Sequence, residues 1–118
     1  MDLHEPIILG PTSSNNTITA TAFLEGSLRK LKENIKPFIN SGLDIINSLE
    51  IVSYDRIEGA KDKIGIIIDE SPKEVANEDQ TAVDLYKTIF VQAKAIQELS
   101  EKNKSFEERL KKLEKLLL

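Results

Sequence analysis

The sequence predicts an α+β protein with a short β-rich N-terminal segment, a small domain of helices and strands, and one long C-terminal helix. Residues 17–23 alternate with a period of two and are rich in threonine, which is typical of strands. Residues 64–68 form a short β-branched run that favours a strand over a buried helix. From Leu85 onward, apolar residues recur at steps of four and three, as in coiled-coil helices. The patterns divide the chain into residues 1–26, 27–83 and 84–118.

Composition excludes several function classes. The 118 residues carry a formal net charge of −4 with intermixed signs, so the chain offers no basic field for nucleic acid or anionic membrane. Absence of cysteine removes disulfides and zinc–thiolate sites. His4 is the single histidine, so one chain cannot assemble a histidine-based metal site or triad. We therefore expect no metal, no cofactor and no nucleic-acid partner.

Hydropathy predicts neither a membrane span nor a secretion signal. No run approaches the roughly 20 apolar residues that cross a bilayer. The N-terminal residues lack the basic and apolar regions of a signal peptide. We expect a soluble chain, without a membrane partner, that is cytoplasmic when it is made.

A helix is predicted to begin at Ser27, which would serve as its N-cap. Apolar residues at helical spacing follow it, and Pro37 interrupts the pattern. We expect a break near Lys36 and a second helix toward Ser48. The apolar positions are Leu28, Leu31, Ile35, Phe38 and Ile39.

Two short strands and a short helix are predicted in the middle of the chain. Residues 50–56 and 63–68 flank the polar turn 58–62, in which Gly59 supplies turn chemistry. Ser71 and Pro72 then resemble the N-cap and first position of a helix that ends near Asn77.

The C-terminal helix should run from about Asp84 and be some 50 Å long at about 1.5 Å per residue. Because that exceeds what a small domain buries against itself, we expect it to pair with copies of itself, although the heptads alone do not separate dimer from trimer. Gln92 and Asn103 are polar positions that typically set register and oligomer state. The charged residues 107, 108, 111, 112, 114 and 115 are interpreted as a solvated face with ion pairs within or between helices, each worth only some tenths of a kcal/mol. The seam comprises Leu85, Ile89, Gln92, Ile96, Leu99, Asn103, Phe106, Leu110, Leu113 and Leu117.

Ser27 and Lys32 have the spacing of a self-cleaving serine/lysine pair. If Ser27 opens a helix, Lys32 follows within a turn and a half, close enough for its amine to reach the hydroxyl. Gly26 would let the attacking oxygen approach its carbonyl and would permit strained backbone angles. From the segment alone, an ordinary capped surface helix explains the same residues.

The surrounding pattern is more specific. Ser27, Lys30, Lys32, Asn34 and Ile35 match a Ser-Asp-x-Arg-x-Lys-x-Asn-Ile start. From Glu25 onward the chain thus resembles the intramolecular chaperone domain at the C-terminus of bacteriophage tail-spike, tail-fibre and neck-appendage proteins, the endosialidase chaperone family. Further elements that match in order are residues 43–49, 52–54, 64–72, 83–86 and 95–99.

The resemblance implies a self-cleaving trimerisation chaperone. Residues 1–26 would be the end of a β-rich fibre stalk, the passenger, and the seam would join a homotrimer. Ser27 would attack the carbonyl of Gly26 with Lys32 as general base, which makes the chain an autoproteolytic serine peptidase that acts once on itself. Assembly would occur in the host cytoplasm, and the passenger would enter the virion while the chaperone is released.

Two departures from the family pattern bear on cleavage. Leu28 stands where the family carries an aspartate, and Lys30 stands in place of arginine. If the family aspartate orients the dyad, three outcomes are open: cleavage is slow, cleavage is lost, or another acid such as Glu25 or Glu33 supports the dyad. Lys30 and Asn34 are further supporting residues. Lys32 must lose its proton to act as a base, through burial or through a positive field from residues 29, 30 and 36. The alternative function is a non-catalytic coiled-coil trimerisation or adaptor module.

Overall fold

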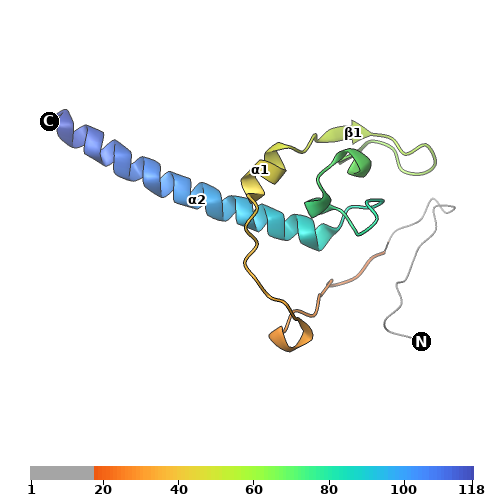
Figure 1. Cartoon of the computed structure of the whole chain (residues 1–118). Coiled ribbons are helices and arrows are strands. Elements are labelled where there is room, and N and C mark those ends of the chain that lie inside the picture. The colour runs from red at the N-terminus through yellow and green to blue at the C-terminus, as the bar shows by residue number, and fades with distance from the viewer. Residues whose placement is uncertain (1–17) are drawn as a thin grey trace. The chain divides into compact units, whose positions relative to one another are not determined.

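The computed structural model describes residues 18–118 (Figure 1). They fall into two units, which are described separately: residues 18–38 with 53–64, and residues 39–52 with 65–118. His4 and most of the predicted β-rich segment lie outside the described residues. Residues 18–26 are exposed and form no strand. A strand needs a hydrogen-bonding partner, and the predicted partners of this segment are other copies of the chain.

The long C-terminal helix is confirmed as α2, Leu85–Leu116. Asp84 is its N-cap, and the Asp84 carboxylate accepts a 3.0 Å hydrogen bond from the backbone amide of Lys87. That bond satisfies an amide in the first turn that lacks an intrahelical partner. The helix therefore begins directly after Asp84, as predicted.

Helix α1, Gly42–Asn47, packs against the N-terminal half of α2, and the C-terminal half of α2 projects beyond this contact (Figure 1). The Ser41 hydroxyl accepts a 3.1 Å hydrogen bond from the Asp44 amide and so caps α1. A Cβ at Gly42 would lie 2.6 Å from the carbonyl oxygen of Val91 and 2.7 Å from the amide of Ala95. Glycine therefore permits the close approach of the two helices. The predicted second helix is confirmed, and it ends at Ser48.

The core of this unit lies where α1, α2 and a short 3-10 turn meet. Val75, in the turn η3 (Lys73–Val75), is fully buried and packs with Ile45 of α1 and Val91 of α2. The half-buried residues around this centre are Ile46, Leu49, Ile66 and Ile68.

The first predicted helix is wrong. Residues 27–40 contain a single 3-10 turn, η1 (Arg29–Leu31), with the extended residue Leu28 before it. Asn34 has a left-handed backbone (φ 54°), which a helix does not accommodate. A helix of about ten residues is marginal without packing, and the side chains of this segment are exposed.

The two strands are confirmed but are shorter than predicted. Strand β1, Val52–Tyr54, pairs with β2, Lys63–Gly65, in an antiparallel sheet. Gly59 has φ 116° in the connecting turn, which favours glycine. The Asp55 carboxylate accepts a 2.7 Å hydrogen bond from the Asp62 amide and holds the turn closed.

Beyond β2, two further predictions need correction. Residues 66–68 do not continue the strand, and the turn η2 (Ile68–Glu70) follows instead. Ser71 does not cap a helix, because its hydroxyl donates to the carbonyl of Ile67 (2.7 Å). The predicted helix after it is the 3-10 turn η3. Packing of Ile66, Ile68 and Val75 into the core sets these local conformations against their sequence preferences.

A closed loop links η3 to α2. Ala76 and Val83 form an antiparallel bridge, and the Asp84 amide donates a 2.9 Å hydrogen bond to the carbonyl of Val75. The Lys87 ammonium donates to the carbonyls of Lys73 (3.0 Å) and Ala76 (2.8 Å). These bonds fix the start of α2 against the core. No helix within residues 18–118 is long and apolar enough to cross a membrane.

Candidate functional site

Ser27 and Lys32 are in contact. The Nζ atom of Lys32 donates a 2.5 Å hydrogen bond to Oγ of Ser27. The turn η1 brings them together, because the amides of Leu31 and Lys32 bond to the carbonyls of Leu28 and Arg29, each at 3.0 Å. The approach that the spacing predicts is therefore present, but a 3-10 turn produces it instead of an α-helix.

The contact has the geometry of proton transfer between an amine and a hydroxyl. Both residues are exposed. A lysine ammonium is a donor without an acceptor lone pair, so in this arrangement Lys32 polarises the Ser27 oxygen and does not yet draw its proton. Activation of the serine needs a change at Lys32 from ammonium to amine.

Gly26 lies directly before the serine. Its φ lies outside the left-handed region. A Cβ at Gly26 would lie 3.4 Å from Cδ1 of Leu31. That distance is an ordinary van der Waals contact, so the Leu31 side chain lies beside this peptide.

The predicted supporting residues lie in the same exposed segment. Within the described residues, none of Glu25, Lys30, Glu33 and Asn34 forms a hydrogen bond to Ser27 or Lys32. The left-handed backbone of Asn34 turns the chain just after Lys32. The structure thus assembles the pair but does not bring an acid to it.

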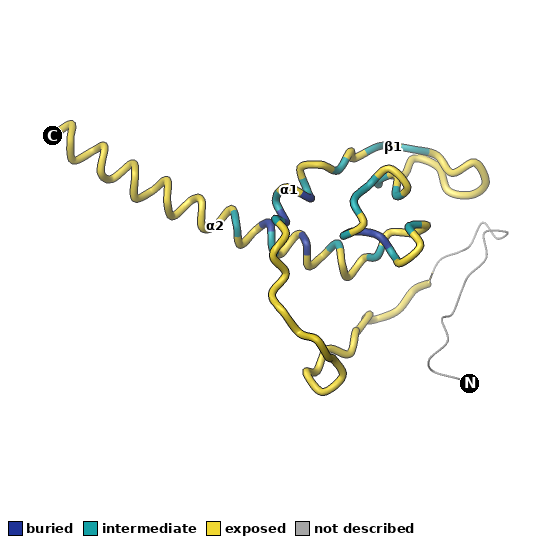
Figure 2. Tube along the Cα trace, in the orientation of Figure 1, coloured by how far each residue is buried: buried dark blue, intermediate teal, exposed yellow. Residues whose placement is uncertain are grey.

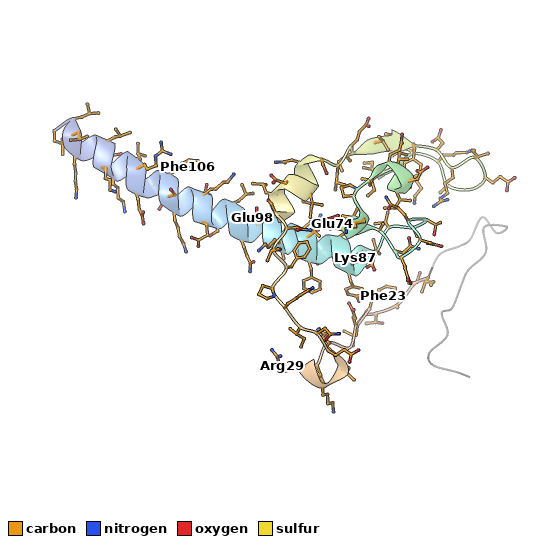
Figure 3. The ribbon with its side chains drawn as sticks, in the orientation of Figure 1. Phe23, Arg29, Glu74, Lys87, Glu98 and Phe106 are labelled. Carbon is orange, nitrogen blue, oxygen red and sulfur yellow. The ribbon has the colours of Figure 1, made fainter. Side chains whose placement is uncertain are left out.

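A second polar cluster, which sequence reasoning missed, joins α1 to α2. Glu98 of α2 accepts hydrogen bonds from the Ser41 hydroxyl (2.6 Å) and the Gly42 amide (2.7 Å). Figure 3 labels Glu98 beside the start of α1. The hydrogen bond from Ser41, aided by the Gly42 amide, lowers the pKa of the Glu98 carboxyl. The Ser41-x-x-Asp44 pattern could have located the cap of α1, but no local signal points to Glu98.

The predicted seam of α2 is exposed in the single chain, and Figure 2 shows the C-terminal half of this helix exposed throughout. All ten seam residues are exposed, from Leu99 at 45% to Leu117 at 86% among the apolar ones. The covered stripe lies beside the seam, where α1 and η3 pack on α2. The residues of that covered stripe are Thr88, Val91, Ala95 and Glu98. Intrachain packing and the seam therefore use different sides of the same helix.

Residues 18–118 contain no cluster of side chains that could bind a metal ion. No group of three or more histidine, cysteine, aspartate or glutamate side chains is placed to hold an ion there. The site is therefore best described by its serine, its lysine and the exposed helical seam.

Comparison with known proteins gives one match. Residues 27–79 match a peptidase family model described as chaperone of endosialidase. The match begins at Ser27 and covers η1, α1, both strands and η3, whereas α2 lies outside it. No curated protein and no solved structure matches the chain.

Proposed function

Because residues 27–79 belong to the endosialidase chaperone family, we propose that this chain is the self-cleaving, trimerising chaperone of a phage fibre or appendage protein. The family establishes a chaperone role. Cleavage between Gly26 and Ser27, the trimer and the fibre passenger are our proposal.

The observation that carries the cleavage proposal is the 2.5 Å contact between Lys32 Nζ and Ser27 Oγ. Both residues fall on the motif at which the family match begins. The base and the nucleophile thus lie within six residues, next to the bond to be cut. Such a short segment, with both groups beside the bond, suits an enzyme that acts once on its own chain.

The reaction proceeds by an acyl shift followed by hydrolysis. Neutral Lys32 takes the proton of the Ser27 hydroxyl, and Oγ attacks the carbonyl carbon of Gly26. The C–N bond breaks, the Ser27 nitrogen takes the proton from Lys32, and an ester joins Gly26 to Oγ. Water then cleaves the ester, which leaves a carboxylate on Gly26 and a free amine and hydroxyl on Ser27.

Assembly of several copies would convert Lys32 from ammonium to amine. Leu28, Leu31 and Ile35 lie in the same segment as the pair and are 61%, 64% and 53% exposed in the single chain. Packing of these side chains against neighbouring copies would remove water from Lys32 and favour its neutral form. Cleavage would then follow assembly.

The exposed seam of α2 supports the trimer. It presents a continuous apolar stripe along the helix, which coiled-coil partners cover. Three joined helices hold three stalk ends at high effective concentration, which favours slow intermolecular strand pairing. Removal of the template afterwards makes the stability of the stalk kinetic.

We further propose the location of each step. The chain assembles in the host cytoplasm, the passenger remains in the virion, and the chaperone is released. Residues 1–26 are the passenger end in this proposal.

Intact mass after denaturation tests cleavage directly. The wild-type chain, incubated at neutral and mildly alkaline pH, should give fragments 1–26 and 27–118. Ser27→Ala and Lys32→Ala should stay whole, because each lacks one partner of the pair. Lys63→Ala removes an equal charge from an exposed strand residue and should cleave like the wild type.

The same experiment separates the alternative function. A non-catalytic trimerisation or adaptor module would stay whole in every variant and would still assemble through α2. Two observations favour this alternative: Leu28 replaces the family aspartate, and no carboxylate of residues 18–118 forms a hydrogen bond to the pair. An uncleaved but trimeric wild-type chain would overturn the cleavage proposal.

A further inference from the structure

Four charged residues flank the seam in the C-terminal half of α2. We propose that they hold neighbouring copies parallel and in register, with Lys102 paired to Glu107 of the next copy and Arg109 paired to Glu114 of the next copy. This inference rests on the proposed assembly through α2, and for Glu107 and Glu114 it specifies which ion pairs between helices the charged face would form.

The heptad positions place these charges. Asn103 and Leu110 occupy a positions, and Phe106 and Leu113 occupy d positions. Lys102 and Arg109 precede the a residues and are therefore at g, whereas Glu107 and Glu114 follow the d residues and are at e. In parallel coiled coils, a g residue faces the e residue five positions further along the neighbouring helix. Both cations thus meet a carboxylate.

The same charges do not pair within one chain. Residues five apart point to different sides of their own helix, whereas residues three or four apart meet. Among residues 18–118, the ion pair present is Lys104–Glu101 at 3.4 Å, and both of its members lie on the outward face. The Arg109 guanidinium lies 6.0 Å from the ring centre of the seam residue Phe106. This cation is therefore already at the edge of the seam (Figure 3 labels Phe106).

The charge pattern selects one arrangement of the copies. An antiparallel pair would bring g beside g and e beside e, so cations would face cations and carboxylates would face carboxylates. A parallel pair that slips by one heptad keeps one of the two ion pairs and loses the other. The in-register parallel arrangement alone satisfies both.

Packing within the chain covers part of the N-terminal half of α2, which explains why the charges lie in its C-terminal half. In the N-terminal half, the g positions are Thr88 and Ala95. There α1 and η3 pack on α2, and Ala95 is buried and Thr88 half-buried. Charges there would be desolvated by this packing. Residues 101–118 are exposed throughout, so ion pairs between copies can form there without that cost.

Charge reversal in the full chain tests the proposal. Lys102→Glu with Arg109→Glu makes every g and e charge in this half negative, and association should weaken by roughly tenfold or more at low salt. The difference in association between this variant and the wild type should shrink near 1 M salt, where the screening length is about 3 Å. Adding Glu107→Lys and Glu114→Lys exchanges the two signs and should restore association. Light scattering across a dilution series measures each variant.

A matched control carries the same change of charge on the outward face. Lys104→Glu with Lys111→Glu alters two b positions that are also seven residues apart, and association should stay within about twofold of the wild type. Orientation has its own readout: the chain has no cysteine, so a spin label on Leu118→Cys reports one position. Labels should lie close together in a parallel, in-register assembly.

The outcomes separate this inference from the proposed function. An assembled wild type whose charge-reversed variant associates equally well, or whose labels lie far apart, overturns the register proposal and leaves the trimerising role in place. A wild type that stays monomeric at high concentration overturns both. Loss on reversal, rescue on exchange and short label distances together establish the ion pairs.

Discussion

The amide of Gly42 donates a 2.7 Å hydrogen bond to Oε1 of Glu98, 56 residues further along the chain. The other carboxylate oxygen accepts the Ser41 hydroxyl at 2.6 Å. One side chain of α2 thereby satisfies groups at the N-terminus of α1, where amides lack intrahelical partners. Glu98 therefore fixes both the position and the start of α1.

Glu98→Gln should make the thermal midpoint of the protein less dependent on pH in the acid range. The pKa of Glu98 lies below its ordinary value of 4.5 because Ser41 and Gly42 donate to its charged form. A lowered folded-state pKa contributes stability above the unfolded value, and that stability is lost as pH falls through the folded value. Thermal midpoints measured from about pH 6 to pH 3 should fall less steeply in the variant.

Glu101→Gln is the control for that series. Glu101 is one turn away, and its ion pair with Lys104 is exposed, so its removal should change little. Equal slopes for wild type and Glu98→Gln would show that the carboxylate adds nothing to the junction of α1 and α2.

Gly42→Ala should destabilise the fold by about 2 kcal/mol. The new Cβ would lie within 3 Å of the backbone of Val91 and Ala95, which cannot move without displacing α2. An ordinary glycine-to-alanine exchange in a helix is stabilising. A lower free energy of unfolding in Gly42→Ala would therefore indicate the close contact with α2. Chemical unfolding at fixed protein concentration measures it, with exposed Asn47→Ala as the control in the same helix. A more stable Gly42→Ala protein would refute the close contact.

Leu28→Asp should accelerate cleavage by about tenfold or more, because it restores an acid directly after the nucleophile that can orient the pair. Leu28 is 61% exposed in the single chain, so the folded chain accommodates a carboxylate there. The rate is measured by intact mass over time. Ile39→Asp introduces the same charge at an 88% exposed position and should leave the rate unchanged. An unaltered rate in Leu28→Asp would make the departure at this position irrelevant to cleavage.

Asn103→Ile should raise the melting midpoint of the assembled chain and broaden its range of oligomers. A polar residue at an a position costs stability but specifies register and oligomer state. Circular dichroism and sedimentation equilibrium measure the two effects. Ser105→Ile adds a similar side chain outside the seam and should leave the oligomer state unchanged. A single trimeric species with a lower midpoint would show that Asn103 does not have this role.

Elements with strong local signals were predicted well. Repeating apolar residues predicted α2, and short apolar runs around a polar turn predicted the two strands. The contact between Ser27 and Lys32 was also predicted, because five residues of spacing limit how far apart the two side chains lie. The helix predicted around them was wrong, since apolar spacing alone does not stabilise a short helix that packs on nothing.

The sequence by itself determined the long helix, its apolar seam, the paired strands and the close spacing of Ser27 and Lys32, because periodicity and turn residues act over a few positions. The tertiary structure alone decided which face of α2 receives α1, why Gly42 must lack a side chain and why Glu98 lies at the start of α1. It also made Val75 the centre of the core. These contacts join residues far apart along the chain, and their formation depends on the path of the loops between them.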